Sequence, residues 1–197
     1  GTPTTVGYSN LVPGGYSQNM VLLESMLLAV PNGLATQHAA LTEPMAVGLH
    51  AVRMAKMNKG ELPLVIGCGP VGLAVISALK QLGIGPIIAV DYSVKRRHLA
   101  LLMGADEAID PSKNSPYESW MAMAKNDVNG NSMPIEPFSG QTFREGVFFE
   151  CVGVPGVIDQ IMAGAPRNCR IVVVGVCMES DQIRPLVGIN KELNLQF

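Results

Sequence analysis

The sequence predicts an α/β fold with a doubly wound parallel sheet, and three observations lead to this prediction. From Glu61 onward, strand-like and helix-like segments alternate along the chain. Three of the expected strands, at 64–66, 87–90 and 171–174, are continuously apolar, as is typical of strands buried on both faces. A G-x-G-x-x-G pattern falls between the first of these strands and an apolar helical segment. Such alternation favours right-handed crossovers with helices on both faces of the sheet.

The first 33 residues differ from the rest of the chain. Pro13, Gly14 and Gly15 form a turn signal, and the segments 16–23 and 26–30 have the composition of short strands. Pro31, Asn32 and Gly33 close this region. We therefore expect a short β strip at the N-terminus, followed by a helix from about 34 to 57.

Each later element follows from its own pattern of apolar residues. Lys59 and Gly60 end the preceding helix, and 125–142 is polar and rich in Gly, Pro, Asn and Ser, which predicts a surface loop. The remaining segments predict strands at 62–67, 87–91, 107–109, 146–151 and 170–175, and helices near 70–82, 94–103, 116–125 and 155–164.

Composition narrows the functional classes. The chain has 197 residues, 48% of them apolar, and a net charge of −2, so neither nucleic acid nor an anionic membrane is an expected partner. No apolar run approaches the roughly 20 residues that span a bilayer, and no signal sequence is recognisable, so we expect a cytoplasmic protein. The four cysteines form no C-x-x-C pair and lie in apolar surroundings, which predicts reduced, buried thiols.

The glycine pattern has the chemistry of a dinucleotide site. Gly67 allows a tight turn, Gly69 lets the backbone approach a pyrophosphate, and Gly72 lets the helix that begins at Pro70 and Val71 pack on the strand. Asp91 follows 19 residues after Gly72, at the end of the next strand, where its carboxylate can bind the adenosine ribose.

The same residues favour NAD over NADP. A carboxylate at Asp91 repels a 2′-phosphate. Arg96 and Arg97 leave an alternative open, because arginines near that position can hold the additional phosphate.

A series of motifs extends this pattern over most of the chain, in this order: Gly14-Gly15-Tyr16-Ser17-Gln18, Ala39-Ala40-Leu41-Thr42-Glu43-Pro44, His50-Ala51-Val52, Val65 to Leu73, Asp91 with Arg96 and Ala100, Gly104-Ala105-Asp106, Glu150-Cys151-Val152-Gly153 and Ile171 to Gly175. In their order and spacing, these motifs resemble the zinc-type medium-chain alcohol and polyol dehydrogenases. The resemblance implies that residues 34–197 are a Rossmann NAD-binding domain, truncated at its C-terminus. Residues 1–33 would be the remnant of a GroES-like catalytic domain.

The resemblance also implies roles for single residues. Arg96 would lie along the adenosine, Tyr92 would also bind the cofactor, and Cys151, Val152 and Gly153 would border the adenosine-binding crevice. The backbone of Gly175 and Val176 would contact the nicotinamide carboxamide. Glu43 matches a glutamate at or near the catalytic zinc, although an acid before Pro44 at a helix start also suits the helix dipole.

The activity implied is hydride transfer between NAD and a secondary alcohol or polyol, or a related alcohol or aldehyde. The cysteine and histidine that hold zinc in this family have no counterpart here, so the fragment is expected to bind cofactor without turnover and to contain no catalytic residue. His38, His50 and His98 lack metal-spaced partners, and His50 suits a core or interface position. Similar proteins form dimers through an edge strand, here near 183–187, so a homodimer or higher homo-oligomer is expected.

Three alternatives remain open at this point. A zinc-free quinone-reductase-like relative and a non-catalytic nucleotide-binding module would both keep the glycine loop. A methyltransferase that uses S-adenosylmethionine also needs a glycine loop and an acid at a strand end, but the G-x-G-P-V-G-L form and Glu43-Pro44 argue against it.

Overall fold

The computed structural model describes residues 6–7, 10–125, 132–134 and 142–197. The chain forms two compact units, Gly1–Ala40 and Leu41–Phe197, and each is described by itself. The chain passes from one unit to the other after Ala40, whereas the sequence predicts a domain boundary after residue 33. The assignment of 1–33 and 34–197 to two different domains stays a prediction.

The first unit contains the 3-10 helix η1 (Glu24–Met26) and the short helix α1 (Thr36–Ala39). The strands predicted at 16–23 and 26–30 are wrong, because these residues form bends, extended backbone and η1. A strand is held by a neighbour that pairs with its N–H and C=O groups, and no described segment pairs with either stretch. Apolar side chains such as Val21 and Leu28 are consequently exposed within this unit.

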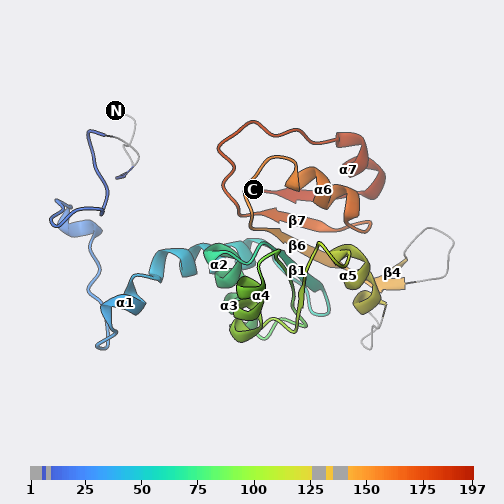
Figure 1. The fold of residues 1–197 in the computed structure, drawn as a ribbon, viewed down its shortest axis with the longest axis horizontal. Helices are drawn as coiled ribbons and strands as arrows, with labels where there is room; N and C mark the ends of the chain where they lie inside the picture. The colour runs from blue at the N-terminus through green and yellow to red at the C-terminus, as the bar shows by residue number, and fades with distance from the viewer. Residues whose placement is uncertain (1–5, 8–9, 126–131, 135–141) are drawn as a thin grey trace. The chain divides into compact units, whose positions relative to one another are not determined.

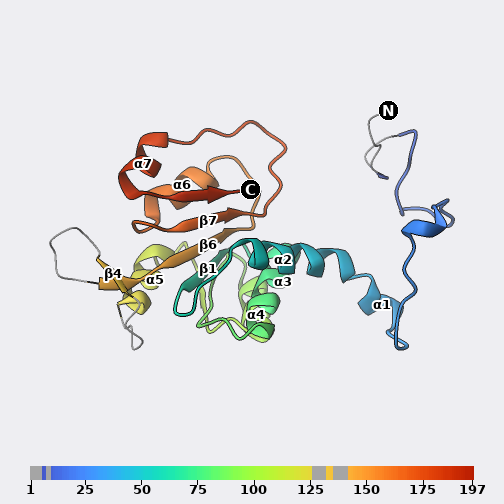
Figure 2. The ribbon, with the colours of Figure 1, turned by 180° about the vertical axis from the view of Figure 1, so that it is seen from behind.

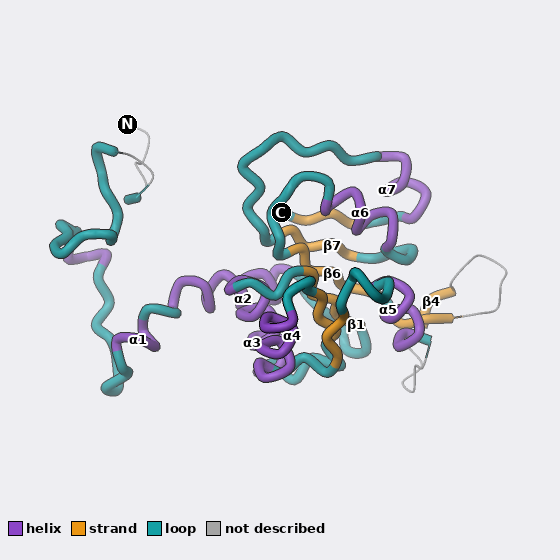
Figure 3. The backbone as a smooth tube through the Cα atoms, viewed as in Figure 1, coloured by secondary structure: helices purple, strands orange, loops and turns teal. Residues whose placement is uncertain are grey.

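The second unit is built on a six-stranded parallel sheet, drawn in orange in Figure 3. The strand order is β3-β2-β1-β6-β7-β8, and every neighbouring pair is parallel. The chain moves outward from β1 to β3, returns to the other side of β1, and moves outward again. The bounds are Leu62–Ile66 for β1, Ile88–Val90 for β2, Glu107–Ile109 for β3, Gly146–Glu150 for β6, Arg170–Val173 for β7 and Asn194–Gln196 for β8.

Helices cover both faces of this sheet, as the sequence predicted (Figure 1). One face packs against α2, α3 and α4, and the other against α5 and α6. The helix α7 lies beside α6 in both views (Figures 1 and 2). The bounds are Thr42–Met54 for α2, Pro70–Gln81 for α3, Val94–Met103 for α4, Pro116–Ala124 for α5, Val157–Gly164 for α6 and Pro185–Lys191 for α7.

The core alternates along each strand. In β1, Leu62 and Leu64 pack with the α5 and α6 side, whereas Val65 packs with the α2, α3 and α4 side. This is the period of two expected of a strand buried on both faces. The predicted alternation of strands and helices from Glu61 onward is thus confirmed. The single helix predicted over 34–57 is instead two helices, α1 and α2, with a break between them.

Two further expectations about strands are wrong. The polar segment 125–142, predicted as a loop, contains β4 (Ser132–Pro134) and the first residue of β5 (Thr142–Arg144), and these two strands pair antiparallel. The ring of Phe143 in β5 packs on Trp120. The polar residues around Phe143 give no sign of this contact in the sequence. The remainder of that segment, 126–131 and 135–141, lies outside the described residues.

The edge strand predicted near 183–187 is also wrong. Residues 185–191 form α7, and the sheet edge is β8 instead. Pro185 occupies the first helical turn, where its missing N–H costs nothing, whereas a proline cannot donate a hydrogen bond to a strand ladder. None of the described helices has the length and apolar character needed to cross a bilayer.

Candidate dinucleotide site

The candidate site lies at the carboxyl ends of β1 and β6, where the strand order reverses. Ligands of open α/β sheets bind at such a reversal. The Gly67 N–H donates to the Val90 carbonyl at 2.8 Å, and the Cys151 N–H donates to the Ile66 carbonyl at 2.8 Å. These bonds hold the turns after β1, β2 and β6 together at one edge of the sheet.

The glycine loop packs tightly on one side and faces open space on the other. A Cβ on Gly67, whose φ is +93°, would lie 2.9 Å from Val152 Cγ2, and one on Gly72 would lie 1.8 Å from the Gly67 carbonyl oxygen. A Cβ on Gly69 would meet nothing within 4 Å. Gly69 is the N-cap of α3, and the first turn of a helix carries N–H groups that the helix cannot satisfy. The loop therefore has the backbone donors and open face that a pyrophosphate needs.

Asp91 connects the turn after β2 to this loop. Its buried carboxylate accepts a hydrogen bond from the Cys68 N–H at Oδ2 (2.9 Å) and from the Ser93 N–H at Oδ1 (2.7 Å). Each carboxylate oxygen has capacity for a further bond, so Asp91 can still accept from a ribose hydroxyl. Arg96 Nη1 lies 3.7 Å from Oδ2, and its side chain is 56% exposed.

Arg97 differs from Arg96 because its guanidinium is engaged by the protein. Nη1 donates to the carbonyls of Asp91 (2.8 Å) and Tyr92 (2.7 Å), and Nη2 lies 3.0 Å from Asp110 Oδ2. The hydrogen bond from the Ser112 hydroxyl, together with Arg97, lowers the pKa of Asp110. Arg97 thus joins the ends of β2 and β3, which leaves the more exposed Arg96 as the arginine able to meet a ligand.

A buried acid at this edge, Glu150, was not among the predicted site residues. It ends β6 and is 1% exposed. Its Oε1 accepts from the N–H groups of Val152 (2.7 Å) and Gly153 (2.8 Å), and its main-chain oxygen accepts from Val174 and Gly175, both at 2.9 Å. The signal in the sequence is an acid that closes the otherwise apolar segment Gly146-Val147-Phe148-Phe149.

The turns that follow β6 and β7 touch each other. A Cβ on Gly175 would lie 2.4 Å from the Gly153 nitrogen, and one on Gly153 would lie 2.8 Å from the Val176 nitrogen. The side chains of Val152, Val176 and Tyr92 are exposed. The structure therefore places the predicted residues on turns at one edge of the sheet, although β7 ends at Val173, before Gly175. Their contacts with a cofactor remain predictions.

The predicted metal residue, Glu43, lies on a different element, α2. Glu43 is exposed in the first turn of α2, and the described part of the chain contains no group of three or more His, Cys, Asp or Glu side chains placed to hold a metal ion. A catalytic zinc normally has three protein ligands, so these residues do not form a zinc site by themselves. Glu43 as a zinc neighbour remains a prediction.

The histidines are all exposed. A core position for His50 is therefore wrong, because Gly48, Ala51 and Val52 form the buried face of α2. His38 and His98 are likewise exposed.

The cysteines differ in their exposure. All four are free; Cys68 and Cys169 are buried, whereas Cys151 and Cys177 are only partly so. The expectation of a buried thiol is therefore wrong for Cys177, in the turn beyond β7, whereas Cys151 is partly exposed as a residue but has a buried thiol. Burial, followed by the charge of Asp91, raises the pKa of Cys68 to about 12, and burial also raises the pKa values of Cys151 and Cys169.

We expect Cys177 to react first with iodoacetamide. At pH 8 a thiol of pKa about 12 is ionised to about one part in 10⁴, and the thiolate is the nucleophile. Peptide mass mapping after short exposures at pH 7 and pH 9 measures the order of modification, and the chain unfolded in urea is the control in which all four thiols react. Modification of Cys68 as fast as Cys177 in the folded chain would contradict this expectation.

Comparisons with known proteins agree with this geometry. The profile of the family described as Zinc-binding dehydrogenase matches residues 70–196. The (R,R)-butanediol dehydrogenase of Bacillus subtilis is 33% identical over 179 residues, which cover 91% of this chain and 47% of that protein. The chain spans about half the length of the curated relatives that it matches.

Two solved structures share the fold. The L-idonate 5-dehydrogenase of Escherichia coli is 25% identical with a TM-score of 0.72, over 94% of this chain and 48% of that one. A zinc-binding dehydrogenase of Sinorhizobium meliloti bound to NADP is 26% identical with a TM-score of 0.65, over 85% and 45% of the two chains. Because the family profile covers most of the 197 residues and the relatives share the sheet that carries the glycine loop, this chain belongs to the zinc-binding dehydrogenase family.

Proposed function

We propose that residues 34–197 form the NAD-binding domain of an oxidoreductase and that residues 1–33 belong to its catalytic domain. One observation carries the proposal. The backbone of the glycine loop, open at Gly69, is tied through the Cys68 N–H to the carboxylate of Asp91 at 2.9 Å. A pyrophosphate donor and a ribose acceptor are thereby held in one rigid unit, as a dinucleotide requires.

The residues of this chain would bind and orient the cofactor. The N–H groups at the start of α3 would hold the pyrophosphate, and Asp91 would accept from a ribose hydroxyl. The apolar side chains of Val152 and Val176 would exclude water along the crevice. When bound, the nicotinamide ring accepts or donates a hydride.

The charges around Asp91 support NAD over NADP. The buried carboxylate repels a 2′-phosphate, and Arg97 is occupied with Asp110 and two carbonyls. Arg96 is the feature that favours the second candidate, because its exposed guanidinium could meet a 2′-phosphate and one relative was solved with NADP. Both cofactors belong to the nicotinamide class, so this alternative concerns selectivity alone.

The names of the relatives support alcohols or polyols as substrates of the whole enzyme, since they are a butanediol dehydrogenase and an L-idonate dehydrogenase. The family description supports a zinc ion in that enzyme. The described residues do not assemble a zinc site, so we assign no chemical step to zinc.

The proposal includes a homodimer or higher homo-oligomer in the cytoplasm. β8 is an edge of the sheet, and an edge strand is a template for pairing with a second copy. Four free cysteines suit a reducing compartment.

Replacing Asp91 tests the cofactor site. We expect the wild-type chain to bind NADH more tightly than NADPH, and Asp91→Ala to weaken NADH binding by about tenfold, because a hydrogen bond to a charged group is worth about 1.5 kcal/mol or more. Asp91→Asn, which keeps an acceptor, should lose less. Cofactor fluorescence during titration measures these affinities, with the exposed Glu118→Gln as a control of equal charge change.

Each alternative has its own outcome in the same titration. Tighter binding of NADPH would mean that Arg96 outweighs Asp91. Binding of S-adenosylmethionine without NADH would favour a methyltransferase. Absence of any nicotinamide binding by the folded chain would contradict the proposal.

A further inference from the structure

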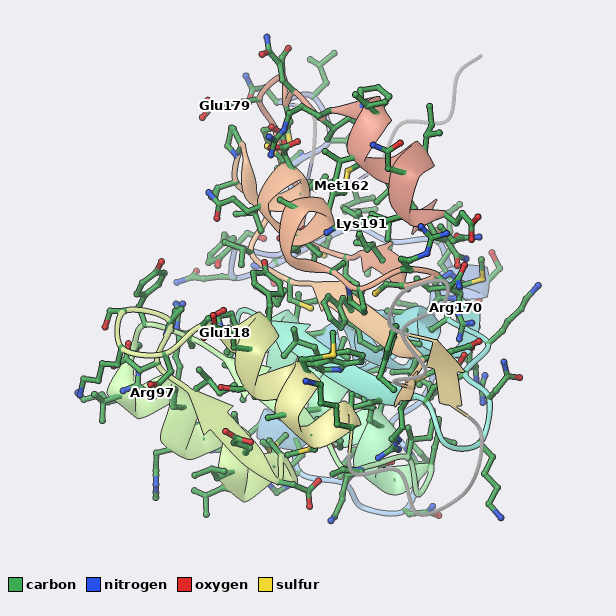
Figure 4. All side chains as sticks on the ribbon, turned by 90° about the vertical axis from the view of Figure 1, so that its right-hand side faces the viewer. Arg97, Glu118, Met162, Arg170, Glu179 and Lys191 are labelled. Carbon is green, nitrogen blue, oxygen red and sulfur yellow. The ribbon has the colours of Figure 1, made fainter. Side chains whose placement is uncertain are left out.

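Glu150 is a buried charge at the end of the sheet where the cofactor is proposed to bind, and the proposed mechanism does not use it. Four charged side chains are buried in the described part of the chain: Glu61, Asp91, Arg144 and Glu150. Glu61 and Arg144 lie at the amino ends of the strands, together with Arg170, which Figure 4 shows on the opposite side of the domain from Arg97. Glu150 and Asp91 are therefore the buried charges at the carboxyl edge.

These two acids differ in their surroundings. Asp91 has Arg96 within 3.7 Å and accepts hydrogen bonds on both oxygens. Glu150 is absent from the ion pairs of the described residues, and backbone N–H groups alone donate to its carboxylate. A charge without a cationic partner in a buried position acts on its neighbourhood with little screening.

The path of a dinucleotide over this sheet indicates which part of the cofactor would lie near Glu150. Such a fold has two mononucleotide-binding halves, and the dinucleotide crosses from one to the other at the reversal of strand order. Asp91, after β2, marks the adenosine half, and the start of α3 marks the pyrophosphate. The second half therefore lies over the turns after β6 and β7.

Glu150 joins these two turns. Its Oε1 holds the Val152 and Gly153 N–H groups, and its main-chain oxygen holds those of Val174 and Gly175. Its Oε2 lies directly behind Gly175, where an added Cβ would be 2.8 Å from that oxygen. The carboxylate therefore lies against the backbone of Gly175, the residue predicted to contact the nicotinamide carboxamide.

We propose that Glu150 is a positioning residue for the nicotinamide half of the cofactor and that its negative charge favours the oxidised, cationic ring over the reduced, neutral one. This inference rests on the proposed function. The nicotinamide ring loses its positive charge when it accepts a hydride, so a fixed anion nearby stabilises the oxidised form selectively. A purely structural role would affect both forms equally.

The substitution Glu150→Gln tests this inference in the 197-residue chain. Glutamine has the same shape and keeps one oxygen for the Val152 and Gly153 N–H groups, but it has no charge. We expect the ratio Kd(NAD⁺)/Kd(NADH) to rise about fivefold, an effect typical of one charge acting through partly screened surroundings. ADP-ribose, which lacks the nicotinamide, should keep its affinity. Glu118→Gln, at an exposed position of α5, is the matched control, and its ratio should stay unchanged.

Several results would overturn the inference. Equal weakening of NAD⁺ and NADH binding, or an unchanged ratio, would leave Glu150 with a structural role alone, and weaker ADP-ribose binding would show distortion of the whole crevice. If Glu150→Gln does not fold by circular dichroism, Glu150→Asp keeps the charge and must keep the ratio within about twofold. If the wild-type chain binds ADP-ribose, NAD⁺ and NADH but Glu150→Gln leaves the ratio unchanged, this inference alone is refuted. If the wild-type chain binds none of the three, the proposed function is refuted.

Discussion

Replacing Gly72 with alanine is expected to abolish NADH binding and to lower the free energy of unfolding by about 3 kcal/mol. The added Cβ would lie 1.8 Å from the carbonyl oxygen of Gly67 and 2.9 Å from its carbonyl carbon. Both are backbone atoms that cannot rotate away, so α3 must shift from the turn after β1. That shift separates the N-terminus of α3 from the loop that it completes. Urea denaturation and NADH titration measure the two effects.

Gly69→Ala is the matched control for this prediction. It adds the same methyl group at the N-cap of α3, where the φ of −72° is one that alanine adopts readily. The added Cβ would meet nothing within 4 Å. We expect this variant to keep wild-type stability while its methyl group obstructs the close approach of the pyrophosphate. Equal stability of Gly72→Ala and the wild type would contradict the packing argument.

Much of the sheet could be predicted because local preference and tertiary packing agree there. The helix predicted near 94–103 forms as α4 with those bounds, with Ser93 accepting from the Arg96 N–H as its cap and Gly104 in the left-handed conformation at its end. The predicted spacing from Gly72 to Asp91 places the acid beside the glycine loop, as the Cys68–Asp91 hydrogen bond shows. Motifs of this kind encode neighbouring strands within one βαβ unit.

The role of Glu150 could not be predicted in the same way. Its main chain contacts Val174 and Gly175, which lie on the far side of α6 in the sequence. That contact depends on which strands become neighbours after the chain reverses direction, and a single sequence contains no local signal for it. The engagement of Arg97 by Asp110 depends in the same way on the pairing of β2 with β3.

The errors at 16–23, 26–30 and 183–187 have a related cause. An apolar composition makes a strand possible, but a ladder forms when another backbone is available to pair with it. No described segment pairs with 16–23 or 26–30, and Pro185 favours the start of α7 in the third case. The strand β8 was missed because it is three residues long and lies next to that helix.

Trp120→Ala is expected to lower the free energy of unfolding by about 3–5 kcal/mol, the range for removing a large aromatic side chain from a core. Trp120 is 0% exposed on α5, and its ring meets Phe148 and Phe143 edge-on, with centroids 5.3 and 6.1 Å away. Its Nε1–H donates to the Leu62 carbonyl at 3.1 Å, which attaches α5 to the start of β1. Because this is the chain's single tryptophan, unfolding is best followed by circular dichroism.

Trp120→Phe separates the two contributions. It keeps much of the aromatic packing but leaves the buried Leu62 carbonyl without this donor, so we expect a loss of about 1–3 kcal/mol. Trp120 lies on the face of the sheet opposite α3, with Leu64 and Ile161, so both folded variants should bind NADH within about twofold of the wild type. A stability loss below about 1 kcal/mol for Trp120→Ala would contradict the assigned packing. A selective loss of NADH affinity in the folded variants would instead show that this face of the core controls the shape of the crevice.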